Sequence, residues 1–158
     1  LKLVNGTVFT PLEPSIFAPW RGIEMDATSS INAKNAGYAA EIGDWTGCGM
    51  IGENIASLTI TNSLTVKAAD LKAGNHLTVS GALVTRPEVR VTLEDAASLN
   101  ALEPGDAQPP FAFAASATSI SAKPRRASGC DFAGWSVMDG EDGLSWAFDH
   151  SGMTVIVR

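Results

Sequence analysis

Two acidic residues near the N-terminus have the spacing and chemistry of a possible catalytic pair. Glu24 and Asp26 are separated by one residue, so on a β-strand both side chains would project from the same face. Glycoside hydrolysis needs two carboxyl groups about 5–10 Å apart across the bond that is cleaved. Short acidic pairs are also typical of an ordinary solvated surface. Polysaccharide hydrolysis through Glu24 and Asp26 is therefore the third of three functional hypotheses.

The tryptophans suggest a second kind of chemistry. The chain has four of them among eleven aromatic residues, at positions Trp20, Trp45, Trp135 and Trp146. Exposed indoles form flat apolar platforms for sugar rings, and neighbouring polar side chains can hold the sugar hydroxyls. The two C-terminal tryptophans alternate with other large apolar residues, which favours a core position. Trp20 and Trp45 stand in loop-like sequence beside Arg21 and Asp44, and these four residues are the predicted ligand-binding site for carbohydrate.

The two cysteines, Cys48 and Cys130, could form a disulfide in an oxidising compartment. The bond would close a loop of about 80 residues, which the chain-entropy model values at ~4 kcal/mol. The alternative is a pair of small buried thiols. The chain has no CxxC pair, and its two histidines, His76 and His150, stand apart. We therefore predict no metal site and no cofactor.

Composition limits the possible partners. The chain has 158 residues, 45% of them hydrophobic and 18% charged, which is typical of one folded domain. A net charge of −6 disfavours nucleic acid, which requires a basic surface. No stretch approaches the ~20 apolar residues of a membrane span. Because the chain begins with Leu1 and shows no signal-peptide pattern, we interpret it as a fragment of a larger parent protein.

Short segments in the middle of the chain alternate apolar and polar residues. They are 58–60, 64–66, 77–79 and 89–93, and leucines recur there every six or seven positions. Alternation with period two predicts β-strands with one apolar face, and repetition of such blocks predicts stacked β structure. Turns are expected at Asn62-Ser63, Gly74-Asn75 and Ser80-Gly81. The apolar residues should line one interior, with the intervening threonines outside.

These patterns predict a single, mostly β module over 1–158. Residues 1–57 are expected to be irregular, with a turn at Asn5-Gly6 and either a short helix or strands over 33–42. Residues 58–102 hold the repeated short strands, and 103–110 form a loop. Residues 111–158 contain more aromatic strands separated by strong hairpin signals, including one at 139–143. We expect this last part to be an antiparallel meander that caps the core.

The Leu-Thr-Val blocks continue into Phe111-Ala-Phe113, Gly134-Trp135-Ser-Val137, an Asp-Gly turn and a final Met153-Thr-Val-Ile-Val157. Over 58–158 this order resembles the C-terminal end of bacterial β-strand-repeat surface proteins, the autotransporter-passenger-like β-solenoids. The resemblance implies an extracellular or cell-surface location and no catalysis. The repeat ladder is shorter than in that family, and the aromatic strands of an outer-membrane translocator are absent. A hexapeptide left-handed β-helix is the alternative repeat.

The fold class expected from the sequence is all-β, a short β-solenoid or a stacked-strand or sandwich core, closed by a C-terminal antiparallel hairpin cap. The first functional hypothesis is a non-catalytic structural or capping module of a larger secreted or cell-surface bacterial protein. The second is a carbohydrate-binding module of a secreted glycan-degrading enzyme, with a polysaccharide as partner. The third is a polysaccharide-active β-helix enzyme.

Overall fold

A computed structural model describes residues 1–11, 21–85, 88–95, 111–116, 120–121, 125–126, 135–139 and 143–148. These residues are mostly in strands, and the expected all-β class is confirmed. The described ranges contain one short helix, α1 (Ala68–Lys72), and none long and apolar enough to cross a membrane.

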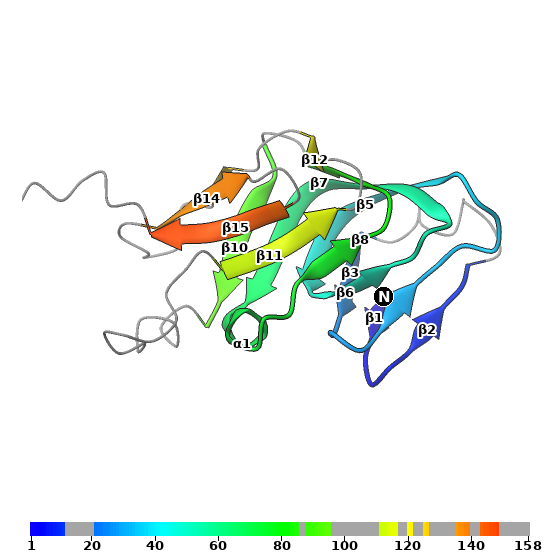
Figure 1. Cartoon of the computed structure of the whole chain (residues 1–158), viewed down its shortest axis with the longest axis horizontal. Coiled ribbons are helices and arrows are strands. Elements are labelled where there is room, and N and C mark those ends of the chain that lie inside the picture. The colour runs from blue at the N-terminus through cyan, green and yellow to red at the C-terminus, as the bar shows by residue number, and fades with distance from the viewer. Residues whose placement is uncertain are drawn as a thin grey trace, which may run out of the picture.

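The strands in the described part of the chain form two sheets (Figure 1). The first sheet has eight strands: β1 (Lys2–Leu3), β3 (Gly22–Met25), β5 (Tyr38–Gly47), β7 (Ile55–Lys67), β9 (Ala82–Thr85), β10 (Arg90–Glu94), β12 (Ile120–Ser121) and β13 (Arg125–Arg126). The second has seven: β2 (Val8–Phe9), β4 (Ser30–Ile31), β6 (Gly49–Ile51), β8 (Leu77–Val79), β11 (Phe111–Ser116), β14 (Trp135–Asp139) and β15 (Gly143–Phe148).

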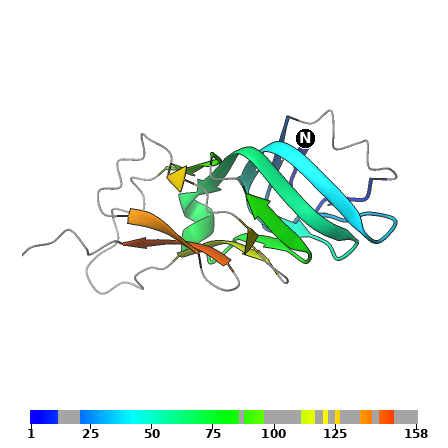
Figure 2. The ribbon, with the colours of Figure 1, turned by 90° about the horizontal axis from the view of Figure 1, so that it is seen from above.

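From β1 to β8, consecutive strands alternate between the two sheets. Each of β1 to β6 pairs in parallel with the strand two places later in the chain. At the N-terminal end the pairing is regular, since Lys2 lies opposite Glu24, Gly22 opposite Asp44 and Val8 opposite Ser30. The stack runs from β1 and β2 at one end to β14 and β15 at the other (Figures 1 and 2).

The core lies on the inner faces of both sheets. In the first sheet Ile23, Trp45, Leu64 and Val91 are register neighbours on successive strands, and all are buried. The apolar residues expected to line one interior are all at most 3% exposed: Leu58, Ile60, Leu64, Val66, Leu77 and Val79. That prediction is confirmed, and burial of this apolar surface is the main force that holds the two sheets together.

The expected turn at Asn62-Ser63 is wrong. The blocks 58–60 and 64–66 belong to one continuous strand, β7, which is long enough to pair with β9 through its first half and with β10 through its second. The six-to-seven-residue leucine step is not a structural repeat either, because Leu71 lies in α1. The turn at Gly74-Asn75 and the bend at Ser80-Gly81 are present as expected.

The N-terminal part is more regular than expected. Residues 1–57 contain β1 to β6, which join the same two sheets as the later strands. A helix over 33–42 is not formed, because β5 begins at Tyr38 and pairs with β7 through most of its length. The Asn5-Gly6 turn is confirmed, with φ of 61° and 75°, and it carries the chain from one sheet to the other.

Close stacking at one corner depends on glycine. Gly47 and Gly49 flank Cys48 between β5 and β6, with φ of 90° and 111°. A Cβ atom at Gly47 would lie 2.2 Å from the carbonyl oxygen of Met25 on the neighbouring strand. A larger residue would therefore be excluded by both the backbone conformation and the space.

The direction of pairing changes at the C-terminal end of the second sheet. β15 pairs antiparallel with β11 and also with β14, where Trp135 lies opposite Phe148 and Asp139 opposite Leu144. The antiparallel pairing predicted across the 139–143 hairpin signal is confirmed. The expected loop at 103–110 and the expected last strand at 153–157 lie outside the described residues.

Candidate functional site

An open groove lies on the outer face of the first sheet, at an irregularity in the pairing of β5 with β7. Ile42 lies opposite Ile60, but Asp44 lies opposite Ser63, so β7 has one extra residue at this point. Gly43 on the shorter side has no side chain to fill the space. A Cβ there would approach the carbonyl oxygen of Arg21 to 2.6 Å.

The groove has a volume of about 720 Å³. Its lining comes from the end of the segment before β3 and from the middle of β5 and β7: Arg21, Glu41, Ile42, Gly43, Asp44, Thr61 and Asn62. Ile42 is buried, Arg21, Glu41 and Asn62 are exposed, and the other lining residues are partly buried. The surface that a ligand would meet is about half polar and half apolar.

Hydrogen bonds fix the polar wall of the groove. Asp44 Oδ1 accepts a hydrogen bond from Asn62 Nδ2 and another from Ser63 Oγ, each at 2.5 Å. Thr61 Oγ1 donates to the carbonyl oxygen of Ile42 at 3.0 Å. The second Asp44 oxygen and the Asn62 carbonyl oxygen could accept hydrogen bonds from a ligand. An arrangement held in this way loses little side-chain entropy when a ligand binds.

The charges in the groove are mixed. Arg21 contributes one positive charge, and Glu41 and Asp44 contribute two negative ones. The two carboxylates offer acceptor oxygens, and the guanidinium of Arg21 offers five N–H donors. This combination suits a neutral ligand that is rich in hydroxyl groups. A strongly anionic ligand would meet two carboxylates and one guanidinium, which is unfavourable.

The structure brings two of the predicted ligand-binding residues together, since Arg21 and Asp44 line the same groove. The expected surface position of Trp45 is wrong. Its side chain is 0% exposed, and the indole Nε1–H donates to the carbonyl oxygen of Gly47 at 3.2 Å. The reason is strand alternation, which turns Trp45 into the core when Asp44 faces outward. Trp20 lies outside the described residues.

Asn62 and Thr61 are groove residues that the sequence did not indicate. An Asn-Ser pair between two apolar blocks has the composition of a turn. The extra residue in β7 becomes visible only when that strand is paired with β5. Glu41 lies three residues before Asp44. The sequence indicates it only as one more carboxylate near Asp44, and not as a groove residue.

Glu24 has ion-pair partners on two other strands. Its Oε1 lies 3.0 Å from Lys2 Nζ on β1 and 2.9 Å from Lys67 Nζ on β7. Hydrogen bonds from Lys67 and then Lys2 lower the pKa of Glu24. A carboxyl group that acts as a general acid near neutral pH needs a raised pKa, whereas the two lysines lower the pKa of Glu24.

Asp26 does not share a strand face with Glu24 as expected, because it lies just beyond the end of β3, in a turn. Its carboxylate accepts hydrogen bonds from the backbone N–H of Asn5 at 2.6 Å and from the N–H and Oγ1 of Thr28 at 3.1 and 2.9 Å. The Asn5 N–H is the largest cause that lowers the pKa of Asp26 to about 2. Both candidate catalytic carboxylates therefore hold structural contacts.

Cys48 is buried in the corner between β5 and β6, at 1% exposure. Burial first, and then the negative charge of Asp70, raises the pKa of its thiol to about 12, so the reactive thiolate is disfavoured. Cys130 lies outside the described residues, and the disulfide stays a prediction. Within the described ranges, no group of three or more His, Cys, Asp or Glu side chains could hold a metal ion.

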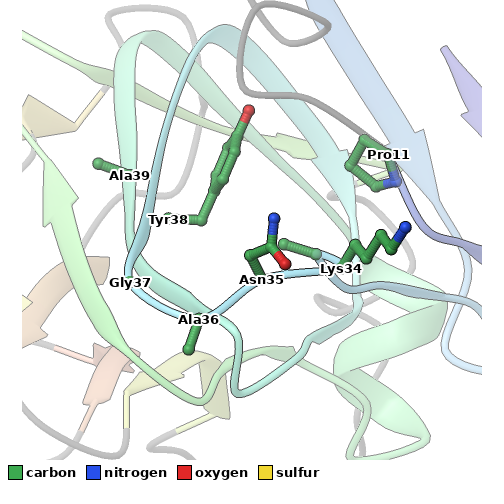
Figure 3. A pocket seen from close by; sticks show the side chains of 8 residues that line it. Pro11, Lys34, Asn35, Ala36, Gly37, Tyr38 and Ala39 are labelled. Atoms are coloured by element: carbon green, nitrogen blue, oxygen red, sulfur yellow. The ribbon is translucent and has the colours of Figure 1, made fainter.

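A smaller pocket of about 290 Å³ lies beside the bend that precedes β5. It is lined by Pro11 and by residues 33–39, and Figure 3 shows the Tyr38 ring, Asn35 and Lys34 around it. Its lining is largely small side chains and the main chain of the bend. It offers fewer charged and hydrogen-bonding groups than the groove.

The chain matches no protein-family model, and comparisons with curated proteins and with solved structures gave no significant match.

Proposed function

We propose that this chain is a non-catalytic structural module of a larger secreted or cell-surface protein, a segment of β-solenoid ended by an antiparallel hairpin. The observation that carries the proposal is the pairing order. From β1 to β8, successive strands alternate between two sheets, and each of β3 to β8 stacks in parallel on the strand two places earlier. In the second sheet, β11 then stacks in parallel on β8. Each pair of strands then acts as one coil whose apolar face is covered by the next coil.

The antiparallel pair at the C-terminal end supports a capping role. The edge of a parallel stack presents unpaired N–H and C=O groups to which another chain could add. β15 covers the β11 edge in the opposite direction, and β14 then covers β15. A further coil would have to continue the parallel direction, so the reversal supports a capping role for β14 and β15. The secreted or surface location rests on the family resemblance of the sequence.

A proline substitution in β15 tests the capping role. Ser145 lies between Ala112 of β11 and Met138 of β14, so Ser145→Pro should disrupt pairing on that strand. We expect faster amide exchange in β11 and concentration-dependent association in sedimentation velocity, with β3 and β5 still protected. Ser145→Thr, which suits a strand, is the control. A Ser145→Pro protein that stays monomeric with β11 fully protected would contradict the capping role.

A second candidate function is carbohydrate binding in the groove. It is favoured because two residues selected from the sequence as possible hydroxyl partners, Arg21 and Asp44, line one preorganised polar groove. Trp20 is the sequence neighbour of Arg21 and could supply an apolar platform. Affinity electrophoresis through gels that contain soluble polysaccharides tests this function.

Arg21→Ala is the most informative variant, because this exposed side chain lines the groove. Asp44 is less suitable, since it also holds Asn62 and Ser63. Retardation by one glycan that is lost in Arg21→Ala and in Trp20→Ala, but kept in the exposed control Lys34→Ala, supports binding in the groove. Absence of retardation by every glycan would reject this function and leave the structural module.

A further inference from the structure

The groove opens onto a row of polar residues that crosses the strands. Strand pairing places Gly22, Asp44, Ser63 and Arg90 side by side on β3, β5, β7 and β10. Asp44 is the member of this row that also lines the groove. Neighbouring strands lie about 4.7–4.9 Å apart, so the row extends along the stacking axis and not along any one strand.

A second polar row lies beside the first. Two residues further along each strand, Glu24, Thr46, Thr65 and Thr92 are register neighbours. All four are partly exposed, because the residues between the two rows turn inward to the core. Threonine is β-branched, so its χ1 rotamers are restricted. The two rows form a firm polar shelf on the outer face of the first sheet, continuous with the groove.

The shelf carries groups that hydrogen-bond with hydroxyls in both directions. Asp44 can accept, and so can Ser63, whose own hydroxyl proton goes to Asp44. The threonines can donate and accept, and the exposed guanidinium of Arg90 can donate. Across the groove and the part of the first row from β3 to β10, Arg21 and Arg90 balance Glu41 and Asp44 in charge; the row continues to Arg125 on β13. The strand spacing is of the same order as the length of one pyranose ring. A chain of neutral sugars laid across the strands would therefore meet a new polar side chain at each strand.

We propose that the ligand of this face is an extended neutral polysaccharide that lies along the stacking axis, from the groove at β3 and β5 across β7 to Arg90 on β10. This inference rests on the carbohydrate-binding function proposed above and adds the direction of the glycan chain and the role of Arg90. A short oligosaccharide fills the groove alone. A longer one also reaches Arg90, so affinity increases with ligand length.

Calorimetric titration with cello-oligosaccharides and laminari-oligosaccharides, from disaccharide to octasaccharide, tests the direction. Arg90→Ala should weaken binding of the octasaccharide about tenfold and leave binding of the shortest ligand that binds unchanged. Such a loss equals about 1.4 kcal/mol, the size of a hydrogen bond to a charged group. Lys72→Ala, an exposed cation on α1, is the matched control and should change neither. Far-ultraviolet circular dichroism of each variant checks that the fold is kept.

The outcomes separate the two proposals. If Arg21→Ala abolishes binding but Arg90→Ala leaves every ligand length unchanged, the groove binds glycan and the proposed direction is wrong. If Arg90→Ala weakens short and long ligands equally, the direction is also wrong, because Arg90 then acts on the groove itself. If the unmodified chain binds no oligosaccharide of any length in either series, nor any polysaccharide in the gels, both proposals fail.

Discussion

Asn32, just after β4, and Asn54, just before β7, lie at one corner and are joined by a hydrogen bond. The backbone N–H of Asn54 donates to Asn32 Oδ1 at 3.3 Å, and Asn54 Nδ2 donates to the carbonyl oxygen of Ala33 at 2.7 Å. Asn32 Oδ1 also accepts from the N–H of Ala33 at 2.9 Å. The corner therefore satisfies main-chain groups that neither sheet can pair.

Asn54→Ala should lower the free energy of unfolding by about 1–2 kcal/mol, because the partly buried carbonyl of Ala33 loses its side-chain donor. Chemical denaturation measured by circular dichroism provides the test. Asn35→Ala, at an exposed position near the same corner, is the control and should change the free energy of unfolding by less than about 0.5 kcal/mol. Equal effects of the two substitutions would show that the Asn54 contact contributes nothing.

Gly81→Ala should be strongly destabilising. A Cβ at this position would lie 2.3 Å from the carbonyl oxygen of Ala56 and 2.4 Å from that of Ile55, both of which are main-chain atoms of β7. We expect the free energy of unfolding to fall by about 3 kcal/mol, at the upper end of the range for overpacking.

Gly37→Ala separates steric exclusion from backbone strain. Gly37 has a φ of 84° but no atom within 4 Å of a Cβ, so only the left-handed conformation opposes alanine. That strain costs about 1–2 kcal/mol. If Gly37→Ala lowers the free energy of unfolding as much as Gly81→Ala does, close packing is not the cause of the loss in Gly81→Ala.

Trp45 should behave as a core residue and not as a ligand platform. Its indole is fully buried between Ile23 and Leu64, so Trp45→Ala should cost about 3–5 kcal/mol. Acrylamide should quench very little of the fluorescence that is lost in Trp45→Phe, because this indole is fully buried. The comparison needs only spectra of the unmodified chain and this variant. Strong quenching of the Trp45 component would contradict its burial.

Asp26 should make stability depend on acid pH. Its folded pKa of about 2 lies below the ordinary value of 3.8, so the deprotonated form is favoured in the folded state. The stabilisation is fully present above pH 3.8 and is lost as the pH falls toward 2. The melting temperature of the unmodified chain should therefore approach that of Asp26→Asn as the pH falls through this window. Glu53→Gln, an exposed carboxylate in another turn, is the control variant. A constant difference between the chain and Asp26→Asn from pH 7 to pH 2 would contradict this role.

Local pattern was enough to predict several features of this fold. The apolar residues of 58–66 and 77–79 alternate with small polar ones, and all six predicted interior positions are buried. The hairpin signal at 139–143 is flanked by the antiparallel pair β14 and β15. The Asn5-Gly6 turn has the positive φ values that this dipeptide tolerates. These features depend on a few neighbouring residues, and for that reason they can be recognised in the sequence.

The groove could be predicted only in part. Arg21 and Asp44 were identifiable by residue type, but their partner Asn62 had the composition of a turn. Trp45 stood in glycine-rich sequence that is typical of a loop, and strand pairing of β5 with β3 and β7 turned it inward. A residue's face depends on where its strand begins and which strand it pairs with.

Local patterns alone predict the all-β class, the buried apolar face of the central strands and the antiparallel end of the second sheet, because period-two alternation and turn composition depend on neighbouring residues. Three-dimensional pairing was needed to show that β1 to β6 join the same stack, that 55–67 form one strand, and that Arg21, Asp44 and Asn62 share a groove. Those features arise from parallel pairing between segments that are far apart in the chain. Parallel pairing leaves no short-range signal, because hydrogen bonds and apolar contacts between distant segments select the register.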